Sequence, residues 1–511
     1  MSEARFPEPS DPDPRPDARR EVPRSDEMAE RVARRLRAEH GALSPGEMAD
    51  LLKQAYREEA DAARASDPSA ETLAEDLEDL SRAVRSTDEI ATRESILGKV
   101  GPGVITGAAD DDPSGIGTYS VVGAQFGYSL LWLVTLSTPL MMAVQEMCGR
   151  LGRVTGQGLA AVLSRFYPRS LVLIAVTLLT LANVINIWAD LNVMAGAAQT
   201  LAGGSFGLWL AGLALSTVLL EVFVPYRLYV RYLKWLCLSL LAYVVTALLP
   251  WVHKDWGEVA RSLFVPSFRP DAEYLMAVVG FLGTTISPYL FFWQAAETVE
   301  EAIADGSAVA PAHPLDSPSD DDLRGVRADT AIGMAASQAV TFFIVLCTAS
   351  TLRGQPLQTA QDAARALQPL GGAAYGLFTL GIIGTGLLAI PTMAGSVAYA
   401  VCEVFGWRYG LYRRLARARA FYVTIAVTTV AGYLLNLVNQ LSAVRGLLYA
   451  AVINGIVAPP LIALLLLACN DRRVVGRHVN GWLSNLLGGL AIIVMGGAAM
   501  VLVRALLSGA P

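Results

Sequence analysis

The chain has 511 residues, of which 53% are hydrophobic and 17% charged, and its formal net charge is −6. Ordinary soluble proteins of this length are less apolar and carry more charge, so this composition indicates a membrane protein. No basic stripe interleaved with aromatic residues occurs, which argues against nucleic acid as a partner.

The polar N-terminal part divides into two stretches. Residues 1–25 are rich in Pro, Asp and Arg and predict a disordered tail. Residues 26–95 predict a small cytosolic helical region, because apolar residues recur at helical spacing, as in Leu73, Leu77, Leu80 and Val84. This region is interpreted either as a solvated tether or as a regulatory or partner-binding module, and its protein partners are not identified by the sequence.

Residues 96–511 predict a transmembrane domain. Apolar windows of about 20 residues recur, each long enough to cross roughly 30 Å of hydrocarbon. We expect about eleven transmembrane helices, near residues 98–123, 129–150, 170–195, 206–224, 232–252, 273–296, 329–350, 372–402, 419–439, 445–469 and 481–505. The fold class is therefore an all-α membrane protein with the lipid bilayer as its surroundings.

The loops between these spans differ in charge. Those on one side are short and rich in arginine, as at Arg413, Arg414 and Arg417, whereas those on the other side are nearly neutral. Positively charged loops stay inside, so the N-terminus is expected in the cytoplasm and the protein in the bacterial inner membrane. The connection from Glu297 to Asp322 is acidic, but acidic residues contribute little to orientation.

The first span contains a polar interruption, Asp110-Asp111-Asp112-Pro113-Ser114-Gly115. Proline lacks an N–H and pushes the residue before it out of the α region, so a continuous helix is not expected here. Carboxylates inside a membrane are costly and usually functional. Because consecutive helical residues point in different directions, Asp112 at the break is the best placed ligand, and Asp110 and Asp111 are expected to line the vestibule.

The sixth span shows a second interruption, Gly283-Thr284-Thr285-Ile286-Ser287-Pro288-Tyr289. Taken alone it is equally well interpreted as a proline kink. Paired with the first, it predicts two inverted repeats of five helices, each beginning with a broken helix, with a substrate site at the midplane of the membrane.

These residues resemble the NRAMP family of divalent metal transporters from about residue 98 to the C-terminus. The family's Asp-Pro-Gly-Asn is matched by Asp112, Pro113, Ser114 and Gly115. The tract after Gln145 and Glu146, Arg-Leu-Gly-Arg-Val-Thr-Gly, also resembles the family pattern and is the specific part of the match. The resemblance implies a divalent metal ion as the transported substrate.

The resemblance also implies which residues hold the ion. They are Asp112, the Gly115 position, the backbone carbonyl of Thr284, and Ser287, which stands where the family has a methionine. A thioether favours later transition metals, whereas oxygen ligands suit hard ions. Losing the sulfur is therefore expected to admit Mg²⁺ beside Mn²⁺, as in the NRAMP-related magnesium transporters, which this chain resembles most.

The proton path of the family is altered as well. Tyr289 stands at the family's histidine and Val193 at a glutamate, while Asp190 is retained. A tyrosine does not carry protons at neutral pH, so proton coupling is doubtful. Asp190 and Glu146 are candidates for a proton or polar path, with a structurally paired acid as the alternative for Asp190. Asn454 either contacts the ion or its water, or makes an interhelical hydrogen bond.

Other functions also fit parts of the sequence. A proton-coupled Mn²⁺/Fe²⁺ importer of the ordinary NRAMP type and an amino-acid permease of the same fold are alternatives, and a membrane sensor is a third. No nucleophile–base pair, histidine cluster or phosphate loop is evident, so the protein is not expected to be an enzyme or to need a cofactor.

Overall fold

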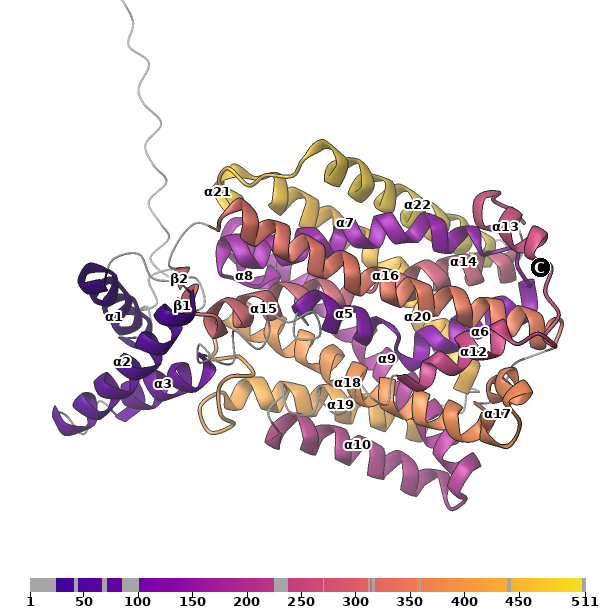
Figure 1. The fold of residues 1–511 in the computed structure, drawn as a ribbon, viewed down its shortest axis with the longest axis horizontal. Coiled ribbons are helices and arrows are strands. Elements are labelled where there is room, and N and C mark those ends of the chain that lie inside the picture. The colour runs from indigo at the N-terminus through magenta and orange to yellow at the C-terminus, as the bar shows by residue number, and fades with distance from the viewer. Residues whose placement is uncertain are drawn as a thin grey trace, which may run out of the picture.

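The computed structural model describes residues 24–40, 45–66, 71–84, 101–224, 238–269, 271–310, 313–314, 318–355, 357, 360–438 and 443–507. Long helices form one elongated bundle, and a small domain of three helices lies at one end of it (Figure 1). We call that end the domain end. The predicted tail, apart from residues 24 and 25, lies outside the described residues, as does the first part of the predicted fifth span.

The small domain consists of α1 (Arg24–His40), α2 (Pro45–Ser66) and α3 (Glu71–Ala83). The bundle consists of α5 (Pro102–Asp110), α6 (Pro113–Phe126), α7 (Trp132–Thr155), α8 (Leu159–Phe166), α9 (Arg169–Ala202), α10 (Phe206–Phe223), η3 (Leu238–Leu240), α12 (Leu241–Leu248), α13 (Trp256–Phe264), α14 (Ala272–Thr285), α15 (Pro288–Ala304), α16 (Asp320–Thr351), α17 (Ala360–Ala364), η4 (Arg365–Ala373), α18 (Ala374–Phe405), α19 (Arg419–Val438), α20 (Ala443–Asn470), α21 (Arg472–Val475) and α22 (Trp482–Leu507). A short antiparallel pair, β1 (Ala308–Ala310) and β2 (His313–Pro314), is an unpredicted addition.

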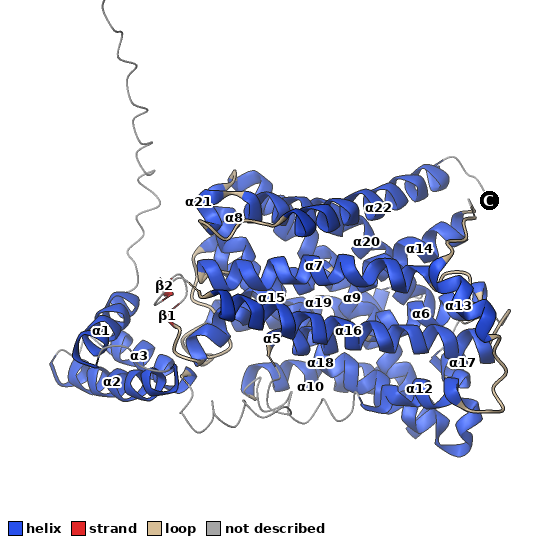
Figure 2. Cartoon of the chain, turned by 45° about the horizontal axis from the view of Figure 1, so that its top comes forward, coloured by secondary structure: helices blue, strands red, loops and turns tan. Residues whose placement is uncertain are grey.

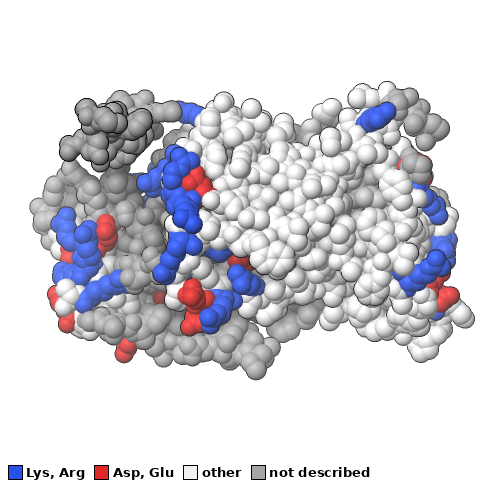
Figure 3. Space-filling model, turned by 90° about the horizontal axis from the view of Figure 1, so that it is seen from above, with Lys and Arg blue, Asp and Glu red and all other residues white. Residues whose placement is uncertain are grey.

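The lengths and hydropathy of the helices in the bundle are those of a membrane domain. Within the described residues, eight helical stretches are long and apolar enough to cross a membrane. The other three predicted spans coincide with α5 and α6, with α7, and with η3 and α12. On the face shown in Figure 3, charged side chains gather at the two ends and leave the middle of the bundle uncharged. The prediction of a multi-pass, all-helical membrane fold is confirmed.

One predicted boundary was wrong. The acidic connection was expected to begin at Glu297, but α15 continues to Ala304 and α16 begins at Asp320. Apolar residues continue the buried stripe through Val299, Ala302 and Ile303, because this end of the helix packs against the small domain and not against solvent.

Both predicted helix breaks are present. The α5 helix ends at Asp110, and α6 begins at Pro113 after the extended residue Asp112. The α14 helix ends at Thr285, and α15 begins at Pro288 after the extended residue Ser287. In each case the proline occupies the first turn of the second half, where its missing N–H costs nothing.

Small residues let the helices that carry the breaks approach their neighbours closely. At Gly283 of α14, a Cβ would lie 2.1 Å from the carbonyl oxygen of Ala451 and 2.3 Å from the amide nitrogen of Gly455, both in α20. These are backbone atoms, so no side chain can move aside. Close contact between small residues is how membrane helices gain packing energy.

We therefore expect Gly283→Val to destabilise the bundle by about 3 kcal/mol, the upper end for overpacking. Thermal unfolding of purified protein in detergent should show a clearly lower midpoint. The matched control is Gly212→Ala in α10, where no atom lies within 4 Å of the added Cβ. Equal midpoints for Gly283→Val and the wild type would contradict the close α14–α20 contact.

Candidate metal-ion site

Asp112 lies at the first break and is fixed by its own helix. It is the N-cap of α6, and its Oδ1 accepts hydrogen bonds from the amide of Gly115, at 2.5 Å, and from the hydroxyl of Ser114, at 3.0 Å. Only 1% of the residue is exposed. The helix N-terminus therefore holds one carboxylate oxygen in place, and Oδ2 has the Ser114 hydroxyl at 3.1 Å.

The absence of a side chain at Gly115 leaves space beside this carboxylate. A Cβ on Gly115 would lie 3.2 Å from Asp112 Oδ1, 3.2 Å from Thr284 Oγ1 and 3.4 Å from the backbone carbonyl of Asp110. Three oxygens from α5, α6 and α14 thus converge on one point. Thr284 Oγ1 is buried and makes no hydrogen bond in the structure, so a ligand oxygen is available from the second broken helix.

Ser287 lies at the second break, and its hydroxyl points back toward the end of α14. Its hydroxyl lies 2.8 Å from the carbonyl oxygen of Thr284 and 3.1 Å from that of Gly283, to either of which it can donate. These carbonyls are among the unpaired acceptors at the end of α14. The carbonyl of Thr284 as a ligand stays a prediction, and the structure places the hydroxyl of the same residue beside Gly115.

Asp110 and Asp111, which are predicted to line the vestibule, are buried in the structure. They are 0% and 5% exposed, and the hydroxyl of Ser337 in α16 lies 2.8 Å from Asp110 Oδ2 and 3.2 Å from Asp111 Oδ1. Ser337 was missed by sequence reasoning. The available signal was the polar pair Ser337-Gln338 inside an otherwise apolar helix.

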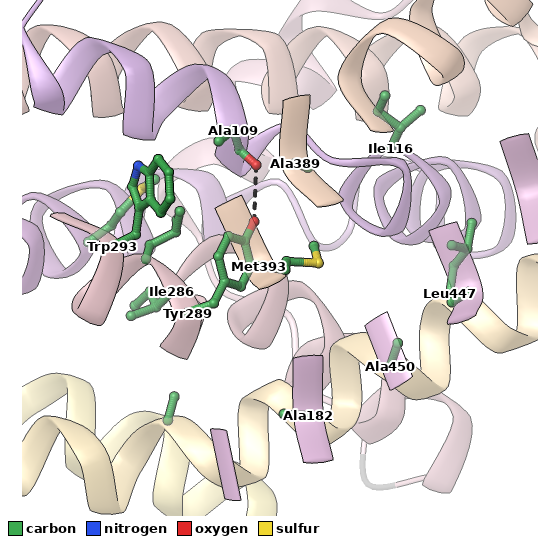
Figure 4. Packing of buried hydrophobic residues seen from close by; sticks show 14 of the residues in the cluster. Ala109, Ile116, Ala182, Ile286, Tyr289, Trp293, Ala389, Met393, Leu447 and Ala450 are labelled. Carbon is green, nitrogen blue, oxygen red and sulfur yellow. Dashed lines mark hydrogen bonds between the residues drawn. The ribbon is translucent and has the colours of Figure 1, made fainter. Parts of the chain in front are cut away.

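Tyr289 joins the two broken helices. Its hydroxyl donates to the carbonyl of Ala109 at 3.0 Å, so the start of α15 is attached to the end of α5 (Figure 4). The ring is fully buried beside Met393 and Ile286. At the family's histidine position this chain therefore has a hydrogen-bond donor that is already engaged with backbone.

Asp190 and Asn454 come from α9 and α20. Both carboxylate oxygens of Asp190 are buried, the carboxylate faces the backbone amide of Ser114 at the first break, and Asp190 interacts electrostatically with Asp112. Asn454 makes a reciprocal amide pair with Asn186, at 2.9 and 3.2 Å. That geometry fits the interhelical hydrogen bond, because the amide oxygen of Asn454 is already used.

The contacts of Glu146 lie away from the two helix breaks. Its Oε1 lies 3.0 Å from the Nε of Arg150 and 3.6 Å from the guanidinium of Arg327. Arg150 also donates to the carbonyl of His478 at 2.5 Å and to Asn480. These pairs tie α7 to the segment before α22, and a part for Glu146 in a proton or polar path stays a prediction.

The site's electrostatics favour a cation. Asp110, Asp111, Asp112 and Asp190 are buried, and among the described residues none of them forms an ion pair with a lysine, arginine or histidine. Carboxyl groups without a basic partner disfavour an anion and stabilise a positive ion that enters between the half-helices. The converging donors are carboxylate, hydroxyl and carbonyl oxygens, which suit hard divalent ions.

Sequence comparisons agree with this geometry. Residues 103–505 match the family described as natural resistance-associated macrophage protein-like (Nramp). The divalent metal cation transporter MntH of Acidiphilium cryptum is 26% identical over 63% of this chain and 74% of its own length. MntH of a Nostoc species is 25% identical over 84% of this chain and 96% of its own length.

Solved structures show the same fold. The manganese transporter of Eremococcus coleocola, crystallised with an aromatic bis-isothiourea substituted compound, superposes with a TM-score of 0.64 at 18% identity. The match covers 81% of this chain and 86% of that one. Another structure, Mhp1 of the nucleobase-cation-symport-1 family, has a TM-score of 0.50 at 15% identity.

Proposed function

The chain belongs to the Nramp family and is a divalent metal cation transporter, and from this premise we propose that it carries Mg²⁺ as well as Mn²⁺, without obligatory coupling to protons. The observation that carries the proposal is the set of converging oxygens around Gly115, with Ser287 in place of a sulfur ligand. Oxygen donors alone do not favour later transition metals over Mg²⁺.

The space beside Gly115 also supports Mg²⁺ as a transported ion. Mg²⁺ gives up its water reluctantly and usually keeps several waters when a protein binds it. A glycine at residue 115 and a serine at residue 287 leave more volume than the family's asparagine and methionine. We propose that Asp112 and Thr284 contact the ion directly or through water, with Asp110 contributing its backbone carbonyl and Ser287 lying next to them.

The absence of proton coupling is supported by Tyr289 and Val193. The hydroxyl of Tyr289 already donates to Ala109, and the buried Val193 has no group that can accept a proton. The retained acid, Asp190, then has the role of adding negative charge near the ion.

We further propose the arrangement of the chain in the bacterial inner membrane. Eleven crossings, with α5 to α12 and α14 to α20 as inverted repeats, fit the two breaks at corresponding positions. The helices α8 and α21, which carry Arg165, Arg472 and Arg473, lie at the domain end (Figure 1), and Arg413 and Arg417 pair with α3. Because basic loops stay inside, the domain end is the cytoplasmic end in this proposal.

The second candidate is a proton-coupled Mn²⁺/Fe²⁺ importer of the ordinary Nramp type. Asp112 and the glycines of the α7 tract are compatible with it: Gly152 lies against the carbonyl of Ala295, and Gly156 ends α7 in the left-handed conformation. Both candidates share these features, so ion selectivity and proton movement separate them. An amino-acid permease is disfavoured by the four buried carboxylates, which would repel a substrate carboxylate.

Purified protein in liposomes tests the proposal. Uptake of Mn²⁺ should be inhibited by millimolar Mg²⁺, Mg²⁺ itself should enter, and a pH dye in the lumen should report no acidification that depends on the protein. Empty liposomes and liposomes with the Asp112→Ala variant are the controls. Uptake that Mg²⁺ does not inhibit, accompanied by stoichiometric proton entry, would return the chain to the proton-coupled group.

A further inference from the structure

The small domain α1–α3 shares a hydrophobic core with the bundle. The buried apolar residues of its three helices form one cluster with Val299, Ala302 and Ile303, on the last turns of α15. Just beyond α15, the left-handed Gly306 lies against Ala49 of α2, where a Cβ would be 3.2 Å away. Figures 1 and 2 show the domain against this end of α15. The domain is therefore docked on the bundle through α15.

Buried ion pairs attach the same domain to a second part of the bundle, the α18–α19 connection (residues 406–418). Asp76 of α3 pairs with Arg413 at 2.7 Å and with Arg408 at 3.3 Å. The side chains of Asp76 and Arg413 are only 2% and 7% exposed. Removing one partner of such a pair leaves an uncompensated buried charge and is strongly destabilising.

Arg417 adds a second attachment one turn along α3. It lies 2.8 Å from Asp79, 3.4 Å from Glu75 and 3.6 Å from Glu78. Burial raises the pKa of the Asp79 carboxyl, although the guanidinium groups of Arg417 and Arg82 act in the opposite direction. The ionised form of Asp79 therefore depends on these arginines staying in place.

A third contact links the two attachment points directly. Glu300 of α15 accepts a hydrogen bond from the amide of Leu411, at 2.6 Å, and another from the hydroxyl of Tyr399 in α18. The α15 helix therefore contacts the end of α18 and the α18–α19 connection directly at this end, and the small domain covers both sides of that contact.

These elements belong to different helix groups. The broken helices α5, α6, α14 and α15 pack with α7 and α16, and α9, α10, α18 and α19 pack with one another; α15 also packs along α18, so the two groups meet at these helices. In transporters with broken helices, access to the site alternates as one group rocks against the other. Glu300 lies twelve residues, about 18 Å, along α15 from Pro288, so movement at the break is transmitted to the docked end.

We propose that α1–α3 is a brace that fastens α15 to the α18–α19 connection and limits the transport rate by opposing separation of the two helix groups at the domain end. The inference rests on the proposed transport of a divalent ion. It gives the N-terminal region a regulatory role and not that of a solvated tether. Opening this end requires the shared core or the Asp76 and Asp79 ion pairs to part.

The test compares full-length variants in liposomes and in detergent. Arg413→Met with Arg417→Met removes both charges and keeps long side chains, and Arg414→Met, at an exposed arginine of the same connection, is the matched control. Hydrogen exchange of the α3 amides reports docking, and initial Mn²⁺ uptake per folded transporter reports rate. We expect faster exchange and several-fold faster uptake in the double variant, and neither change in the control.

Asp76→Asn with Asp79→Asn repeats the test from the side of the small domain. This variant substitutes no residue of the bundle, and it serves if the arginine variants fold poorly. Faster exchange with unchanged or slower uptake overturns the brace, and so does exchange as slow as in the wild type, because the ion pairs would then not hold the domain. Uptake by the wild type is measured first. A protein that transports no metal is thereby distinguished from a small domain that does not limit the transport rate.

Discussion

Asp112→Ala is expected to reduce metal uptake to the level of empty liposomes while the protein still folds. The substitution removes the carboxylate that converges with Thr284 Oγ1 on the space beside Gly115. It also removes the N-cap of α6, which costs about 1 kcal/mol, too little to unfold a bundle of this size. Uptake of Mn²⁺ by purified variant in liposomes, with its unfolding midpoint in detergent, measures both effects.

Asp112→Asn separates charge from capping. Asparagine caps helices as well as aspartate does, so the hydrogen bond with the amide of Gly115 can be kept while the negative charge is lost. Uptake should be lost in this variant too, with an unchanged midpoint. Normal uptake by either folded variant would mean that the ion does not depend on Asp112.

Ser287→Met should shift ion preference toward Mn²⁺ and Cd²⁺ and weaken competition by Mg²⁺. A thioether at the second break supplies the soft ligand that the described oxygens lack. The change removes the hydroxyl that donates to the carbonyls at the end of α14, which costs about 1 kcal/mol. The apparent affinity for each ion in uptake competition, and not the maximal rate, is the relevant measurement.

Adding Gly115→Asn should enlarge that shift. An asparagine supplies a further oxygen, but its Cβ lies 3.2 Å from both Asp112 Oδ1 and Thr284 Oγ1, so these neighbours must give way by a few tenths of an ångström. Ser287→Ala is the control, because it removes the same hydroxyl without adding sulfur. Selectivity that is identical in Ser287→Met and Ser287→Ala would show that residue 287 does not contact the ion.

Much of the transmembrane fold could be predicted from sequence because its signals are local. Apolar windows long enough to cross a bilayer indicate most of the helices, and Pro113 and Pro288 determine where two of them break. Proline acts through its own geometry and the missing N–H, which do not depend on the rest of the chain. The importance of Asp112 follows from the same local reasoning.

Contacts between distant segments were decided only by the tertiary structure. The hydroxyl of Thr284 reaches the site because Gly115 and Gly283 let α6, α14 and α20 approach, and Ser337 meets Asp110 more than 200 residues away. The acidic residues at the end of α15 predict a loop. This segment is a helix in the structure because α1–α3 bury the apolar residues that lie between those acids. Sequence patterns carry the preferences of each segment, whereas burial and pairing depend on which surfaces the folded chain brings together.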